Sequence, residues 1–285
     1  MQEIENRIRQ GAVRSDPFDS RDLFFTPPKI QQTQSTTSET ASKSGVDYSP
    51  EVVLVERTPI SDQGPTSTCA ANAYCDALET LMPDPVVQLS REFAYYNSRR
   101  SHGEEGVDGG TYLRNMFAAG AKLGCSPEDL WPFDVNHINE RPPVCAYEAG
   151  YDYRIKAYYR IATTRSSRGD DIEAAVRMGH PVVLSMQVGK PFSQYTRGST
   201  ELVWHAPTHP IGLHAMVVVG VRRNSVSERQ FKLRNSWGTA WGDGGYAWAA
   251  EDWLTDPFTS DLWVPTFVPP IPQPSHAPAS PLPTL

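Results

Sequence analysis

The sequence predicts an α+β fold in which a helix-rich half is followed by a strand-rich half. Small and apolar residues recur at helical spacing from Cys69 to Leu81, and Pro83 ends that run. After Asp170 the pattern changes to short segments rich in residues that favour strands. A chain of 285 residues is also long enough to bury a large core, either as one domain or as two lobes that share a cleft.

Two further helices are expected in the first half. One begins near Leu89 with Ser90 as its N-cap, and the other spans residues 111–123 and is closed by Gly124. A loop with a short helical turn, residues 123–133, ends this half of the chain.

The second half is expected to begin with a helix over residues 171–178 and to continue as strands. Residues 215–219 form the longest continuous apolar stretch, which is far shorter than the roughly 20 residues of a membrane-spanning helix and therefore indicates a buried strand. The expected strands, including one near the start of the chain, cover residues 52–55, 182–186, 215–221, 231–234 and 246–248.

The N-terminal region, residues 1–47, differs in composition from the middle of the chain. It ends in residues 31–45, which are rich in Gln, Ser and Thr and are typical of a flexible linker. The apolar side chains ahead of this linker are expected to be buried, either on the body of the protein or near its cleft. They are Phe18, Leu23, Phe24 and Phe25.

The folded domain is expected over residues 48–264. Its helical part covers about 62–170 and its β-rich part about 171–264. Residues 265–285 carry eight prolines, which is typical of a solvated, polyproline-like tail without a catalytic role.

Composition excludes several classes of function. The formal net charge of −7 and the pI near 5.5, without a basic stripe, argue against a nucleic-acid partner. No apolar run is long enough to span a membrane, and the N-terminus has no secretory signal. We therefore expect a cytoplasmic protein, with signal-less secretion as the alternative, and a monomer.

The four cysteines are few for a secreted protein of this size that depends on disulfides. Cys125 and Cys145 are the candidate pair, and free, partly buried thiols are the alternative. The spacing of Cys69 and Cys75 matches no short pair of zinc ligands. We expect neither a metal nor another cofactor.

The polar turn at residues 61–68 places Cys69 at the first turn of a helix. Exposed N–H groups and the helix dipole at that position favour a thiolate, the form in which cysteine is a nucleophile. Gln63 stands six residues upstream, close enough to direct its amide to the same point.

A thiolate nucleophile needs a base, and the base needs a group that fixes its tautomer. His214 precedes the buried strand at residues 215–221, where a rigid scaffold can present it to a cleft. A lone histidine there would more often be a core residue held by hydrogen bonds. Asn235, however, leaves a later strand beside Trp237, which can cover the asparagine from water.

The chain resembles the papain-like cysteine proteases in these segments. The interval from Gln63 to Cys69 and the sequence Asn-Ser-Trp-Gly, residues 235–238, with Trp-Gly at residues 241–242, are similar to motifs of that family, and so is the separation of Cys69 from His214. The resemblance covers residues 46–264 and implies a papain-like two-lobed fold, with a helical lobe facing a β-barrel-like lobe across an active-site cleft.

The resemblance also implies a role for individual residues. Cys69 would be the nucleophile, His214 the base and acid, and Asn235 the group that orients the histidine. Gln63, with the backbone N–H of Cys69, would form the oxyanion hole. Trp237 would shield the hydrogen bond between Asn235 and His214.

Four residues would contact substrate by the same resemblance, and one of them is Trp237. Gly109 and Gly110 are similar to paired glycines whose backbone binds an extended peptide. Ser67 stands where the family has a glycine that lines the cleft.

The segment around the nucleophile departs from the family. Thr66 and Val107 stand at positions where the family usually has two cysteines that form a disulfide, and Ala70 replaces a tryptophan. These departures look like the bacterial branch of the family.

The resemblance implies a cysteine endopeptidase that acts on peptide or protein substrates through a thioester acyl-enzyme. One alternative is an inactive or weak family member that binds peptides. Another is an acyl-transfer effector that acts on isopeptides or amines. We also hypothesise that the N-terminal segment contacts the cleft of its own chain and regulates access to it.

Overall fold

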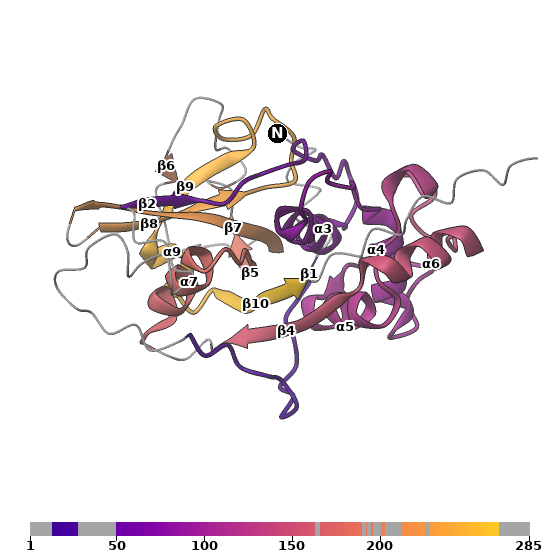
Figure 1. The fold of residues 1–285 in the computed structure, drawn as a ribbon, viewed down its shortest axis with the longest axis horizontal. Coiled ribbons are helices and arrows are strands. Elements are labelled where there is room, and N and C mark those ends of the chain that lie inside the picture. The colour runs from indigo at the N-terminus through magenta and orange to yellow at the C-terminus, as the bar shows by residue number, and fades with distance from the viewer. Residues whose placement is uncertain are drawn as a thin grey trace, which may run out of the picture.

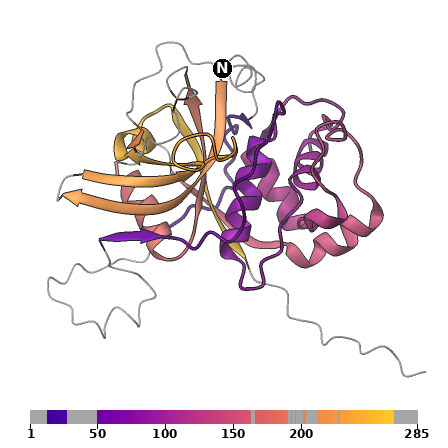
Figure 2. The same ribbon diagram turned by 90° about the horizontal axis from the view of Figure 1, so that it is seen from above.

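A computed structural model describes residues 13–27, 50–162, 166–189, 192, 195, 201–202, 212–225 and 228–267. The expected linker, residues 31–45, lies outside this part of the chain, and so does the expected tail beyond residue 267. Helices α4, α5 and α6 gather on one side of the molecule, the main sheet lies on the other with α7 and α9 against it, and α3 lies between the two sides (Figures 1 and 2).

Three helices of the first half, α3, α4 and α5, form as the sequence predicts, whereas α6 was not predicted. The Ser90 side chain accepts a hydrogen bond from the N–H of Phe93 and so caps α4, and Gly124, with φ of 74°, ends α5. The helices on this side are α3 (Cys69–Leu81), α4 (Arg91–Arg100), α5 (Leu113–Leu123) and α6 (Val144–Gly150), with short 3-10 turns η1 (Glu128–Leu130) and η2 (Tyr151–Tyr153).

The other side is an eight-stranded, mainly antiparallel sheet in the order β4-β10-β5-β7-β8-β9-β6, with β2 paired to β7. Its strands are β2 (Glu51–Val53), β4 (Ile155–Ile161), β5 (Val182–Val188), β6 (Glu201–Leu202), β7 (Gly212–Ser225), β8 (Glu228–Arg234), β9 (Tyr246–Ala250) and β10 (Thr259–Phe267). Of these, β4, β6 and β10 are strands that the sequence pattern did not predict. The last strand continues to Phe267, into the segment expected to be a tail.

Side chains of β7 alternate between the two faces of the sheet and join two hydrophobic clusters. Val217 and Val219 pack in the cluster that includes helix α3. Met216 and Val218 pack in the cluster on the opposite face, where helices α7 (Arg168–Arg177) and α9 (Glu251–Thr255) contribute side chains. Strand β7 is therefore buried on both faces, which fixes its position against α3.

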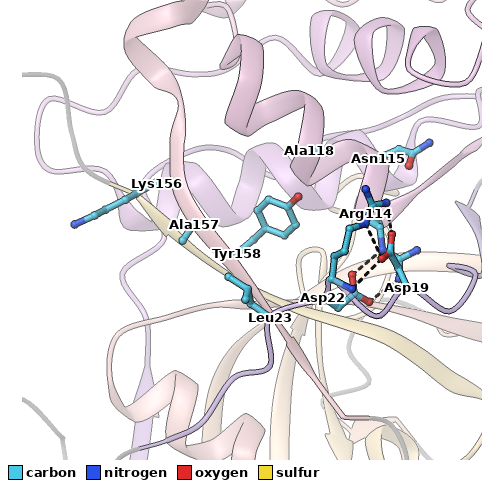
Figure 3. A pocket seen from close by; sticks show the side chains of 10 residues that line it. Asp19, Asp22, Leu23, Arg114, Asn115, Ala118, Lys156, Ala157 and Tyr158 are labelled. Atoms are coloured by element: carbon cyan, nitrogen blue, oxygen red, sulfur yellow. Dashed lines mark hydrogen bonds and ion pairs between the residues drawn. The ribbon is translucent and has the colours of Figure 1, made fainter.

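The N-terminal segment, residues 13–27, is held against the body mainly by polar contacts. Strand β1 (Val13–Arg14) pairs in parallel with β3 (Thr111–Tyr112). The Asp22 carboxylate lies 2.6 Å from the Arg114 guanidinium of α5 (Figure 3). Asp22 and Arg114 also line a cavity of about 520 Å³ between this segment, α5 and β4 (Figure 3).

The expectation that the apolar side chains of this segment are buried is wrong for three of them. Phe18 is 91% exposed, Leu23 60% and Phe24 50%, whereas Phe25 is buried against the sheet. Backbone hydrogen bonds to Arg160 and ion pairs of Asp22 hold the segment instead.

All four cysteines are free thiols. The expected Cys125–Cys145 disulfide is absent, because Cys145 is exposed on α6 while Cys125 is buried with its Sγ atom 3.8 Å from that of Cys75. Within the described ranges, no helix is both long and apolar enough to cross a membrane. The same residues contain no cluster of three or more acidic, histidine or cysteine side chains that could bind a metal ion.

Candidate active site

Cys69 is the first residue of α3 and lies against strand β7. The backbone N–H of Ala215 donates a hydrogen bond to Cys69 Sγ at 3.4 Å. This contact joins residues 146 positions apart in the sequence, and it brings the backbone next to His214 against the nucleophile. The contact depends on the burial of both elements, since α3 and β7 belong to the same hydrophobic cluster.

His214 is oriented by Asn235, which follows the end of β8. His214 Nε2 and Asn235 Oδ1 are 2.7 Å apart, and both residues are buried. The same oxygen accepts the backbone N–H of Ser236 at 2.8 Å. An oxygen at this position requires the proton on Nε2, which leaves Nδ1 as the basic nitrogen of the neutral ring.

Aromatic side chains cover this hydrogen bond. The Trp237 ring lies 4.5 Å from the His214 ring, centroid to centroid, and Trp237 is buried. Phe192 adds a second contact, with its ring 6.0 Å from His214 and 5.3 Å from Trp237. Sequence reasoning missed Phe192, because a lone phenylalanine between strands carries no spacing signal.

Burial dominates the titration of both reactive groups. It raises the pKa of the Cys69 thiol to about 12, although the N–H groups of Ala215 and Ala70 act in the opposite direction. It lowers the pKa of His214 to about 4, against the effect of the hydrogen bond to Asn235. The thiolate expected from the helix position is therefore not favoured in this closed arrangement, where desolvation outweighs the helix terminus.

Gln63 lies close to the same centre and is buried. Its Nε2 donates to the carbonyl oxygen of Thr66 at 2.8 Å, and its Oε1 accepts from Ser236 Oγ at 2.7 Å. These bonds fix the amide between the loop before Cys69 and the loop after Asn235. Since an amide NH₂ group carries two hydrogens, one remains for another acceptor.

Ser67, Gly109 and Gly110, three of the residues expected to contact substrate, form hydrogen bonds within the chain. Ser67 is fully buried, and its backbone N–H donates to Asp108. The carbonyl oxygen of Gly109 accepts hydrogen bonds from the Arg14 guanidinium, and the N–H of Gly110 donates to the Tyr95 hydroxyl. Sequence reasoning identified none of these partners.

A buried charge network stands behind the site. The Arg234 guanidinium, immediately before Asn235, contacts the carboxylates of Glu56 and Asp76. Asp76 also contacts Arg91 at 2.7 Å. Because Asp76 lies on α3, the network joins the strand that carries Asn235 to the helix that carries Cys69.

Comparisons with known proteins identify the family. Residues 46–254 match the papain family of cysteine proteases. The chain is 30% identical over 275 residues to an uncharacterised peptidase C1-like protein of Acanthamoeba polyphaga mimivirus, covering 89% of this chain and 85% of that protein.

Solved structures share the fold. Xylellain, a cysteine protease from Xylella fastidiosa, superposes with a TM-score of 0.76 and 26% identity, over 92% of this chain and 97% of that chain. Digestive procathepsin L 3 from the larval midgut of Tenebrio molitor has a TM-score of 0.68 and 16% identity, over 93% of this chain and 78% of that chain. The second likeness concerns the fold alone.

Proposed function

The chain belongs to the papain family of cysteine proteases and is a cysteine peptidase, and we propose that it is an endopeptidase that works through Cys69, His214 and Asn235. The observation that carries this proposal is the 2.7 Å contact between His214 Nε2 and Asn235 Oδ1 at a histidine whose neighbour binds Cys69 Sγ. These two contacts support a buried centre with a nucleophile, a base and an orienting group.

The proposed reaction begins with transfer of the thiol proton from Cys69 to His214 Nδ1. The sulfur then attacks the peptide carbonyl carbon, and the oxyanion receives hydrogen bonds from the Cys69 backbone N–H and the free Nε2 hydrogen of Gln63. His214 returns the proton to the leaving amine, which leaves a thioester on Cys69. Water, deprotonated by His214, hydrolyses the thioester and restores the thiol.

Proton transfer from Cys69 to His214 depends on the surroundings of the site. The buried thiol, with its pKa raised to about 12, holds its proton against a histidine whose pKa is lowered to about 4. Water or the dipoles of a bound peptide would favour the charged pair over the neutral one. We therefore propose that the ion pair forms when the site is opened to solvent or substrate.

The N-terminal segment is proposed to restrict the groove of its own chain. Arg14 donates to the Gly109 carbonyl oxygen at 3.2 and 3.1 Å, and β1 pairs with β3 directly after Gly110. A substrate that binds the paired glycines would compete with these contacts. Because both halves of the site come from one chain, we propose that the enzyme acts as a monomer.

The likeness to xylellain supports placement in the bacterial branch of the family, while the mimivirus protein is viral. The proposed reaction chemistry depends neither on this placement in the bacterial branch nor on the substrate specificity.

A fluorogenic peptide assay tests the endopeptidase assignment. Cys69→Ala is expected to abolish turnover and labelling by a thiol-directed epoxide while the melting temperature stays near that of the unaltered protein. Cys145→Ala, which removes the exposed free thiol, is the matched control and should retain both. Peptide hydrolysis by the Cys69→Ala protein would refute the assignment.

Mass spectrometry separates the alternatives. An endopeptidase adds water to the acyl group, whereas an acyl-transfer effector adds an amine. A peptide-binding protein without activity would bind the peptide and leave it intact. Addition of an amine would refute the endopeptidase proposal in favour of acyl transfer. An intact peptide after prolonged incubation would refute it in favour of peptide binding without activity.

A further inference from the structure

We propose that Asp108 is a positioning residue of the active site, whose carboxylate holds the loop before the nucleophile to the paired glycines. The proposal rests on the proposed peptidase function, because the positions it fixes are those of Cys69 and the groove beside it. Because this carboxylate accepts the backbone N–H of Ser67, two positions before Cys69, it also places a negative charge near the nucleophile.

The first contact of Asp108 is with the nucleophile loop. The backbone N–H of Ser67 donates to both carboxylate oxygens, at 3.1 Å to Oδ1 and 3.2 Å to Oδ2. Ser67 Oγ donates to the Asp108 carbonyl oxygen at 3.3 Å. Ser67 is fully buried and precedes Cys69 by two positions, so these bonds limit the movement of the backbone that leads into α3.

The second contact extends to the glycines. The Tyr95 hydroxyl donates to Asp108 Oδ1 at 2.6 Å and accepts the backbone N–H of Gly110 at 3.0 Å. Tyr95 is fully buried on α4. A continuous chain of hydrogen bonds therefore runs from Ser67 through Asp108 and Tyr95 to Gly110.

A carboxylate suits this position because its two oxygens can accept from several donors at once, and hydrogen bonds to a charged acceptor are stronger than neutral ones. These hydrogen bonds also join the loop before Cys69 to the loop before Gly109, which have Thr66 and Val107 in place of a pair of cysteines and therefore no covalent link. Among the described residues, neutral N–H and O–H groups donate the hydrogen bonds to the Asp108 carboxylate, and the Arg99 guanidinium interacts with its charge without forming an ion pair.

The charge of Asp108 also acts on the nucleophile. The Asp108 carboxylate contributes to the raised pKa of Cys69, after the larger effect of burial. Charge and geometry can be separated experimentally, because asparagine keeps an oxygen that accepts from Ser67 and Tyr95 but carries no charge. A residue with a merely structural role would not change the ionisation of the thiol.

The first test is the pH dependence of Cys69 alkylation by iodoacetamide, measured on the Cys69 peptide by mass spectrometry in a Cys145→Ala background. Asp108→Asn should shift this profile to lower pH by about half a unit, because a nearby like charge is removed. Asp129→Asn removes one exposed negative charge from η1 and is the matched control. Equal profiles for the two variants would overturn the charge effect.

The second test separates KM from kcat. Asp108→Ala and Tyr95→Phe each break the chain of hydrogen bonds. Both should raise KM for an extended peptide by about tenfold, because the loss of one hydrogen bond to a charged or buried partner weakens binding by about that factor. Asp108→Asn should change KM by less than about threefold. Thermal melting checks that each variant folds.

The outcomes distinguish this proposal from the proposed function. Alkylation requires a reactive thiol but no turnover, so an unaltered protein without peptidase activity would refute the function and leave the charge test valid. An active enzyme in which Asp108→Ala and Tyr95→Phe retain the original KM would refute the positioning role alone.

Discussion

Arg234 Nε lies 3.1 Å from Asp76 Oδ2, and both side chains are almost completely buried. The pair joins the residue before Asn235 to helix α3, seven positions after the nucleophile. Burial lowers the pKa of the Arg234 guanidinium, and the charge of Asp76 raises it. The net pKa lies above the ordinary value for arginine. A charge network buried away from solvent therefore holds Asn235 in position relative to the helix that carries Cys69.

Replacing Arg234 by methionine should destabilise the protein strongly. The change leaves the Asp76 and Glu56 carboxylates without one of their partners, and breaking a buried ion pair typically costs about 3–5 kcal/mol. Urea unfolding measures the free energy of unfolding. Arg100→Met, at an exposed position at the end of α4, is the control, and a loss of stability no larger than that of the control would contradict the role assigned to the network.

Replacing Asn235 by alanine should lower kcat about 10- to 100-fold with a smaller effect on KM. The Nε2 hydrogen of His214 loses its acceptor, and a hydrogen bond to a group that becomes charged contributes about 1.5–3 kcal/mol. Steady-state kinetics on a peptide substrate measure the change.

The chain offers a matched control for this substitution. Asn115 contacts His102 Nδ1 at 2.9 Å, outside the active site, and Asn115→Ala should leave kcat unaltered. A kcat for Asn235→Ala equal to that of the control would mean that His214 is held by other contacts.

Replacing Arg14 by alanine should lower KM for extended peptides by about threefold to tenfold, because the Gly109 carbonyl oxygen becomes free. Stability should change little, since the ion pair of Arg14 with Glu104 is partly exposed. Arg21→Ala removes the same charge from an exposed position of the same segment. If both variants gave the same KM, the proposed restriction of the groove by Arg14 would be wrong.

Asp16 should make stability depend on pH in the mildly acidic range. Burial, followed by the charge of Asp261, raises the pKa of Asp16 to about 6. Because the folded protein holds this proton more tightly than the unfolded chain, the contribution is fully present below about pH 4 and is lost as the pH rises through about 6.

Unfolding of the original protein and of Asp16→Ala at several pH values tests this sign. Between pH 4 and pH 7, the free energy of unfolding of the original protein should fall by about 2 kcal/mol relative to that of Asp16→Ala. Comparison of the two proteins removes the effect of Glu92, whose pKa burial raises to about 7. A difference that is constant with pH would contradict the assignment.

Local patterns predicted the parts of the fold in which neighbours in sequence determine structure. Helical spacing after Cys69 and the apolar run after His214 define α3 and β7, and these elements carry two of the expected catalytic residues. Strand β4 was missed because its exposed, charged and aromatic residues do not alternate cleanly, and its pairing with β10 brings together residues about 100 positions apart.

The environment of the site was harder to predict than its residues. A cysteine at a helix N-terminus suggests a thiolate, but complete burial reverses that expectation, and burial depends on the whole fold. The roles of Phe192 and Asp108 arise from contacts across distant segments, which no motif in one segment can indicate.

The four free thiols have a practical consequence for handling the enzyme. A cysteine nucleophile must be kept reduced to react, and in a protein cross-linked by disulfides the reductant that activates the enzyme also removes part of its stability. Here Asp108 and Tyr95 join the nucleophile loop to the glycines without sulfur. A reductant can therefore keep the nucleophile active without breaking a disulfide of the fold.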